Sequence, residues 1–205
     1  MSTTTQVITL EDDAMKAYVT SQASTVDNCI RGFLSNLYNG KKLIGLDTER
    51  TLIDSNDPKK GSKIAILQLC DGDDCLIIQL PYLDSMPTSL LNFLRFADYT
   101  FIGLGIRENV AELEKEYGVG VRNVVEVGEL AASVKRDKSL VTCGLEELGE
   151  KVDKLRYCRV SSVVFDDWGA EKLTPKQVKY ATLNAYTYFR LGIKLLRGEF
   201  SWRLG

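Results

Sequence analysis

The chain has 205 residues, 44% of them hydrophobic and 26% charged, which is enough apolar material for an ordinary folded core and excludes a disordered chain. Its formal net charge of −2 argues against a protein that coats nucleic acid through bulk positive charge, although a local basic groove remains open. The chain contains no histidine, which excludes Ser-His-Asp and Cys-His catalysis and most zinc hydrolase sites.

The first part of the chain predicts strands around one helix. Val7 to Leu10 has the character of a short strand, and residues 24–38 carry apolar side chains at helical spacing before the stop signal Asn39-Gly40. Three further strands are expected, at residues 43–47, 63–70 and 75–79, and the acidic turn at residues 71–74 joins the last two as an antiparallel hairpin.

Helices and strands alternate in the rest of the chain. The expected strands are 100–103 and 123–127, and the expected helices are 88–96, 105–117, 128–134, 144–152 and 175–196. Thr174 is suited to cap the last helix and Pro175 to its first turn. This order predicts an α/β fold in which helices cover both faces of a mixed sheet of five to six strands, built as one domain over residues 1–205.

Two acids follow an apolar run near the start of the sheet. If Leu43 to Asp47 is a strand, Asp47 and Glu49 point to the same face, because side chains alternate with period two. Two carboxylates placed in this way are typical of a two-metal site for phosphodiester hydrolysis. On the last helix, Tyr180 and Asn184 lie one turn apart, so both can reach one site.

Three segments, in this order, carry a family pattern: Leu46-Asp47-Thr48-Glu49, Gly103-Leu104-Gly105-Ile106-Arg107-Glu108-Asn109, and Leu173-Thr174-Pro175-Lys176-Gln177 followed by Tyr180 and Asn184. Residues 62–70 and Asp166-Asp167-Trp168 add further agreement. Over residues 43–196 the chain resembles the DnaQ-like 3′–5′ exonucleases of the RNase H-like superfamily. The similarity is greatest to the branch of the Werner-syndrome exonuclease domain and to small plant members such as the RISC-interacting clearing exoribonucleases.

The resemblance implies a catalytic set of four acids and one tyrosine. The positions fall on Asp47, Glu49, Asn109, Tyr180 and Asn184, with Asp47, Glu49 and Asn184 as ligands of Mg²⁺ or Mn²⁺ and Tyr180 orienting the attacking water. Two of the four acids are therefore asparagines. An amide oxygen can coordinate a metal but carries no charge, and an amide NH₂ turned inward repels a cation.

The amides leave two functions open. One is an exonuclease with weakened or altered metal binding that hydrolyses single-stranded nucleic acid, RNA being favoured. The other is a catalytically inactive homologue that serves as a nucleic-acid-binding or oligomeric assembly module. Glu108, Asp166 and Asp167 are the neighbouring acids that can compensate for the missing charges.

Nucleic-acid contacts are expected at Thr48, Lys59, Lys60, Gly105 and Lys176, while Lys63, Lys172 and Lys179 either flank the cleft or are solvated. The resemblance implies an RNA or DNA 3′ end as ligand, a homo-oligomer such as a hexameric ring, and RNA-silencing proteins as partners. The resemblance also implies a plant-type protein. We expect it in the cytoplasm or nucleus, because no signal peptide and no membrane-length apolar run is found.

The aromatic and sulfur-containing residues have structural interpretations. Trp168 and Tyr186 can stack on a base, but core packing is favoured for both. The five cysteines favour reduced intracellular thiols, with a disulfide between Cys70 and Cys75 as the alternative. The apolar segment at residues 200–204 is expected to fold back onto the domain or to lie in a subunit contact.

Overall fold

A computed structural model describes residues 3–9, 14–155 and 167–198. Its centre is a seven-stranded mixed sheet with the strand order β1-β2-β5-β4-β3-β6-β7. β2 runs parallel to β5, and β3, β6 and β7 are parallel to one another, whereas the remaining neighbours are antiparallel. The strands are β1 (Thr4–Thr9), β2 (Ala14–Thr20), β3 (Leu43–Leu52), β4 (Ser62–Cys70), β5 (Asp74–Gln79), β6 (Thr100–Gly103) and β7 (Val124–Glu126).

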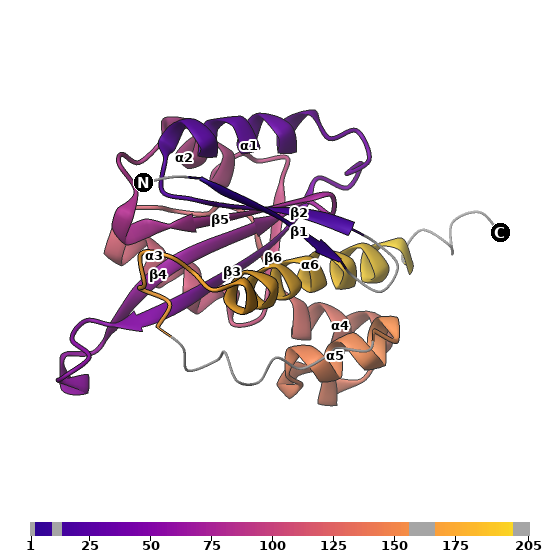
Figure 1. The fold of residues 1–205 in the computed structure, drawn as a ribbon. Coiled ribbons are helices and arrows are strands. Elements are labelled where there is room, and N and C mark those ends of the chain that lie inside the picture. The colour runs from indigo at the N-terminus through magenta and orange to yellow at the C-terminus, as the bar shows by residue number, and fades with distance from the viewer. Residues whose placement is uncertain (1–2, 10–13, 156–166, 199–205) are drawn as a thin grey trace.

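Helices cover both faces of this sheet (Figure 1). They are α1 (Ala23–Ser35), α2 (Thr88–Leu94), α3 (Ile106–Tyr117), α4 (Val127–Lys135), α5 (Leu145–Asp153) and α6 (Pro175–Gly198), with 3₁₀ turns η1 (Pro58–Lys60), η2 (Leu80–Tyr82) and η3 (Lys138–Thr142). The buried side chains of α1, α2 and α3 share one apolar cluster with the sheet. Those of α6 form the cluster on the other face, and α4 and α5 extend it. None of the described helices is long and apolar enough to cross a bilayer.

The α/β fold class predicted from the sequence is confirmed, but the sheet has seven strands instead of five to six. The additional strand is β2, which pairs with both β1 and β5. Within β2 the side chains of Met15, Ala17 and Val19 are buried in alternation. The sequence pattern predicts no strand between Leu10 and the helix at residues 24–38, because this alternation is short; the segment forms a strand by pairing with the parallel edge of β5.

β3 is twice as long as the expected strand and extends from Leu43 to Leu52. Ile44 and Leu46 pack in the cluster of α1 to α3, which leaves Gly45 and Asp47 on the α6 face. A Cβ on Gly45 would lie 1.9 Å from the backbone oxygen of Ala185, so glycine is required for α6 to approach the strand this closely. A register shift between Glu49 and Arg50 interrupts the pairing with β4 directly after the two acids.

The predicted cap of α6 is present. The Gln177 N–H donates to Thr174 Oγ1 at 3.2 Å, and the Thr174 N–H donates to Gln177 Oε1 at 2.9 Å, a reciprocal capping box. Replacing Thr174 with alanine removes one half of the box. We expect Thr174→Ala to lower the stability by about 1 kcal/mol and the Tm by roughly 2–4 °C in a thermal melt. The exposed Thr88→Ala on α2, which makes no side-chain capping bond, is the control, and equal melting of both variants would contradict the role of the box.

Candidate active site

The two acids lie side by side where β3 passes α6. Asp47 is 7% exposed, and one of its carboxylate oxygens accepts the Thr48 N–H at 2.9 Å. Its other oxygen, Oδ2, faces the Asn184 amide nitrogen of α6 at 3.3 Å. Glu49 is half-buried and pairs across the strands with Ile66, which belongs to the apolar cluster of α6. Both carboxylates therefore lie on the α6 face, as the period of two predicted.

Burial raises the pKa of both Asp47 and Glu49. It raises the pKa of Asp47 to about 7, although the bonds from Thr48 and Asn184 oppose the rise. Burial, and then the negative charge of Asp47, raises the pKa of Glu49 to about 8. A neighbouring cation would lower the pKa of both carboxyl groups, because its positive charge offsets the cost of ionising two buried acids side by side.

Tyr180 and Asn184 approach the acids from α6. Burial raises the pKa of the Tyr180 hydroxyl, the hydrogen bond from Asn184 opposes this, and the charges of Glu49 and Asp47 add to it. Asn184 thus turns its NH₂ group, and not its carbonyl oxygen, toward Asp47 and Tyr180. In this orientation the Asn184 amide donates a hydrogen bond to Asp47 and offers no oxygen to a metal. A half-turn of the amide would exchange the positions of its NH₂ group and its oxygen.

Asn109 lies in the first turn of α3 and is half-buried. Its backbone N–H donates to the Gly105 carbonyl at 3.1 Å. Within the described ranges, no side-chain hydrogen bond links Asn109 to Asp47, Glu49, Tyr180 or Asn184. The structure therefore brings four of the five predicted residues into contact or mutual electrostatic influence and leaves Asn109 without a direct bond to them.

The start of α3 is held by an acid that we did not single out. Gly105 adopts a left-handed conformation with φ +63°, and its N–H donates to the Glu126 carboxylate at 2.7 Å, while the Ile106 N–H donates to the other oxygen at 3.1 Å. Glu126 stands at the end of β7 and occupies the favourable N-terminal end of the helix. Glu126 therefore already accepts the Gly105 N–H, and a nucleic acid that contacts Gly105 through this N–H would have to compete with it. The sequence places Glu126 at a strand end but does not indicate its partner.

Arg50 fixes α3 against the strand that carries the acids. Its guanidinium pairs with Glu112 and Glu116, the latter at 2.8 Å, and its Nε donates to Ser62 at 2.9 Å. Glu116 also accepts the Ile64 N–H of β4 at 2.7 Å. Because these bonds join α3, β3 and β4, they set the position of the helix that begins with the Gly105 turn.

The described neighbouring acids do not enter the site. Asp167 Oδ1 accepts the Thr51 hydroxyl and the Gly169 N–H, both at 2.9 Å, and Glu108 is exposed on α3. Asp166 lies outside the described residues. In the part of the chain that the structure describes, no three carboxylate, thiol or imidazole side chains form a group that could hold a metal ion. The site thus presents the carboxylates of Asp47 and Glu49, and the charge of Glu146 on α5 also helps to raise the pKa of Tyr180 without completing a metal-holding group among the described residues.

Among the described residues, the predicted basic side chains form no hydrogen bond or ion pair with the acids of the site. Lys59, Lys60 and Lys176 are exposed, and Lys60 pairs with Asp54 at 2.8 Å. A cavity of about 820 Å³ continues past the acids along β3 and has Arg50, Thr51, Lys63, Tyr82 and Asp167 among its lining residues.

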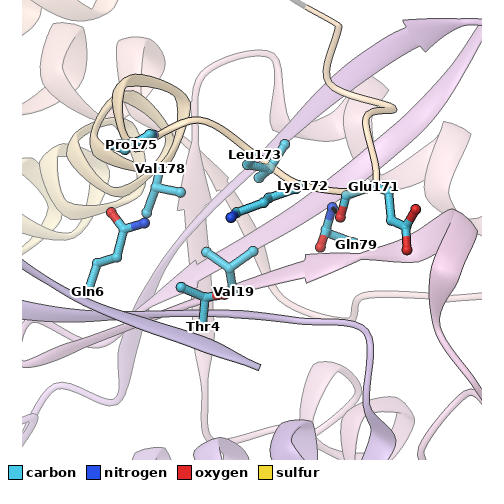
Figure 2. Close-up of a pocket in the computed structure, with 9 residues that line it drawn as sticks. All are labelled: Thr4, Gln6, Val19, Gln79, Glu171, Lys172, Leu173, Pro175 and Val178. Carbon is cyan, nitrogen blue, oxygen red and sulfur yellow. Dashed lines mark hydrogen bonds between the residues drawn. The ribbon is translucent and has the colours of Figure 1, made fainter. Parts of the chain in front are cut away.

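A second cavity, of about 680 Å³, lies between β1, β2 and the loop that leads into α6 (Figure 2). Lys172 reaches into it from the loop, opposite Thr4 and Val19. None of the residues predicted to be catalytic or metal-binding lines this cavity, so the Asp47 site and the Figure 2 cavity are separate features.

Trp168 supports the tyrosine and does not form a stacking platform. It is 2% exposed, and its ring centroid lies 5.9 Å from that of Tyr180. Tyr186 is also buried and contacts Arg190, so core packing, the favoured reading, holds for both aromatics. The four described cysteines are free thiols, including the neighbouring Cys70 and Cys75. The fifth cysteine and the segment 200–204 lie outside the described residues.

The arrangement of buried acids, tyrosine and sheet agrees with the comparisons with known proteins. A family model described as 3′–5′ exonuclease matches residues 23–197. The chain belongs to the 3′–5′ exonuclease family. The match includes all of β3, α3 and α6, which carry the five predicted site positions.

Two curated relatives are also named as 3′–5′ exonuclease proteins. Exonuclease 3′-5′ domain-containing protein 2 of Homo sapiens is 27% identical over 164 residues, which is 78% of this chain and 26% of the human protein. Protein RISC-interacting clearing 3′-5′ exoribonuclease 1 of Arabidopsis thaliana is 25% identical over 130 residues, 62% of this chain and 64% of that protein. The chain thus spans only about a quarter of the human relative.

Solved structures share the fold. Escherichia coli RNase D superposes with a TM-score of 0.69 at 20% identity, over 91% of this chain and 46% of RNase D. Brucella melitensis NrnC bound to pGG has a TM-score of 0.60 at 22% identity, over 82% of this chain and 79% of NrnC. These similarities support the RNase H-like architecture of the exonucleases.

Proposed function

We propose that the protein is a 3′–5′ exonuclease that hydrolyses single-stranded nucleic acid, preferentially RNA, with a divalent metal ion. The observation that carries this proposal is the placement of Asp47 and Glu49 on one face of β3 beside the Tyr180 hydroxyl of α6. Support for RNA comes from the Arabidopsis relative, which is named an exoribonuclease, and support for a metal from NrnC, which was solved with bound Mg²⁺.

The donor set fits one divalent ion better than two. Hard cations prefer carboxylate oxygens, and Asp47 and Glu49 supply two of them, whereas Asn184 directs its NH₂ group at Asp47. Asp47 and Glu49 would hold the ion, which supplies positive charge to the scissile phosphate. Tyr180 would orient the attacking water through its hydroxyl, a role that does not require a histidine.

A second candidate follows from the same amide. Because Asn184 already donates to Asp47 and no three acids among the described residues form a metal-holding group, the protein also suits a catalytically inactive homologue that binds nucleic acid or assembles into oligomers. On this proposal the fold and the cleft are retained while hydrolysis is lost.

Digestion of end-labelled RNA distinguishes the two candidates. We expect purified protein to shorten 5′-labelled single-stranded RNA stepwise from its 3′ end in Mn²⁺, and Asp47→Ala/Glu49→Ala to abolish the shortening. RNA with a blocked 3′ end and the exposed double variant Glu108→Ala/Glu150→Ala are the controls. Digestion that persists in Asp47→Ala/Glu49→Ala would overturn the enzyme proposal. An inert protein that still binds RNA would establish the second candidate.

A further inference from the structure

Gln68 is a buried polar residue without a partner. It lies in β4, is fully buried, and neither its amide nitrogen nor its amide oxygen has a hydrogen-bond partner in the described part of the chain. A desolvated amide that makes no bond destabilises a protein, and such groups are rare in folded chains. We therefore expect an interaction of Gln68 that offsets this free-energy cost.

The strand register places Gln68 directly opposite Asp47. The two residues are Cα partners across β3 and β4, so their side chains leave the same face of the sheet with Cβ atoms about 5 Å apart. The neighbours on that face from β4 and β5 are apolar: Ile66 and Cys70 lie two residues away on β4, and Ile77 is the partner on β5. On β3, Asp47 lies directly opposite Gln68 and Glu49 lies diagonally from it, so Asp47 is the nearer of the two side chains on these strands that can accept a hydrogen bond.

Asp47 has unused capacity to accept a bond. Its Oδ1 receives the Thr48 N–H and its Oδ2 the Asn184 amide, whereas a carboxylate offers about four acceptor sites. Asn184 belongs to α6 and Thr48 to β3, so neither of these bonds comes from β4. The described structure shows no bond between Gln68 and Asp47, and a rotation of the glutamine side chain is needed to form one.

We propose that Gln68 is a positioning residue, whose amide NH₂ donates to the Asp47 carboxylate and fixes its orientation for a divalent ion. The inference rests on the proposed function in one respect, the ion itself. Gln68 touches neither the ion nor the nucleic acid; it acts through Asp47. Once formed, this bond to the carboxylate would offset the cost of burying the amide, which has no partner in the described structure.

A double-mutant cycle in EDTA tests the pairing without relying on activity. Gln68→Met keeps the volume and removes the amide, and Asp47→Ala removes its acceptor. We expect Gln68→Met to lower the Tm of the native protein and to leave unchanged or raise the Tm of Asp47→Ala, because glutamine has no acceptor there. The same shift in both backgrounds, or a more favourable shift in the native one, would overturn the proposal.

Mn²⁺ titration provides the readout of positioning. Isothermal titration should show roughly three- to ten-fold weaker Mn²⁺ binding for Gln68→Met, the size of one hydrogen bond. Leu67→Met, the equally buried neighbour on the opposite face of β4, should bind Mn²⁺ as the native protein does. Unchanged affinity in a folded Gln68→Met protein contradicts the proposal.

A misfolded Gln68→Met protein and a native protein that binds no Mn²⁺ have different consequences. If Gln68→Met does not fold by circular dichroism, Gln68→Asn, which keeps the amide on a shorter stem, is taken through the same cycle with the same criterion. If the native protein binds no Mn²⁺, the metal part of the proposed function fails, while the Tm cycle alone still supports or overturns the pairing of Gln68 with Asp47.

Discussion

Restoring the two acids, by Asn109→Asp combined with Asn184→Asp, is expected to tighten Mn²⁺ binding at least about ten-fold and to increase exonuclease activity. Asn184 Nδ2 lies 3.3 Å from Asp47 Oδ2, so an aspartate at position 184 replaces a donor with a negative charge beside the buried pair. Without metal the new charge repels Asp47, and with metal it attracts the ion. The variant should therefore melt at a lower temperature than the native protein in EDTA and gain more stability when Mn²⁺ is added.

Isothermal titration, melting curves and the labelled-RNA assay measure these effects on the same preparation. Asn92→Asp, on the exposed surface of α2 at the opposite face of the sheet, introduces the same charge away from the site. Equal Mn²⁺ affinity of the restored variant and Asn92→Asp would show that the amides are not what limits metal binding. The single variants then separate Asn184, which contacts Asp47, from Asn109, which does not.

Neutralising the acid pair is expected to stabilise the metal-free protein at pH 8. Burial raises the pKa of Asp47 to about 7 and that of Glu49 to about 8, from the ordinary values of 3.8 and 4.5. Below the ordinary values both states of the protein are protonated and the stability is complete. As the pH rises from there, the unfolded chain releases protons that the folded protein retains, so the native protein loses stability until the pH passes the folded values.

Asp47→Asn/Glu49→Gln lacks these protons and should not show this loss. Glu49 is half-buried, so solvent screening reduces the effect well below the full size of the two shifts. In EDTA we therefore expect the variant to exceed the native stability at pH 8 by on the order of 3 kcal/mol, or roughly 6–12 °C in Tm, and to converge with the native protein near pH 4. Denaturant melts across this range measure the difference, with the exposed pair Glu108→Gln/Glu150→Gln as a control of equal charge change. Parallel pH profiles of native and variant protein would contradict the desolvation of the pair.

These two predictions link the stability of the site to its function. Burial of the two carboxyl groups costs stability near neutral pH, and a divalent ion, as proposed for this site, would offset that cost by stabilising both in their ionised form. Restored acids at positions 109 and 184 increase the need for the ion, and neutral amides at positions 47 and 49 remove it. In EDTA, Asp47→Asn/Glu49→Gln should therefore melt at a higher temperature than Asn109→Asp/Asn184→Asp. Addition of Mn²⁺ should reverse this order.

Local sequence patterns were sufficient for the parts of the fold that depend on few residues. The alternation around Leu43 to Glu49 placed both acids on one face, and Thr174-x-x-Gln177 predicted the cap that starts α6. β2 was missed because its short alternation needs the parallel partner β5, which is more than fifty residues away in the register of Lys16 with Asp74. Similarly, the length of β3 follows from its pairing with β4 up to Leu52.

The sequence by itself determined which residues the site contains: Asp47 and Glu49 on one face of a strand, Tyr180 and Asn184 one turn apart on a helix, and amides at two positions where the resemblance implies acids. Tertiary structure alone decided what each group faces. It directed the Asn184 NH₂ group at Asp47 across a separation of 137 residues, gave the Gly105 N–H to Glu126, and set Gln68 opposite Asp47. The physical reason is that periodicity is a property of neighbouring residues, whereas hydrogen-bond partners and burial arise only when distant segments pack together.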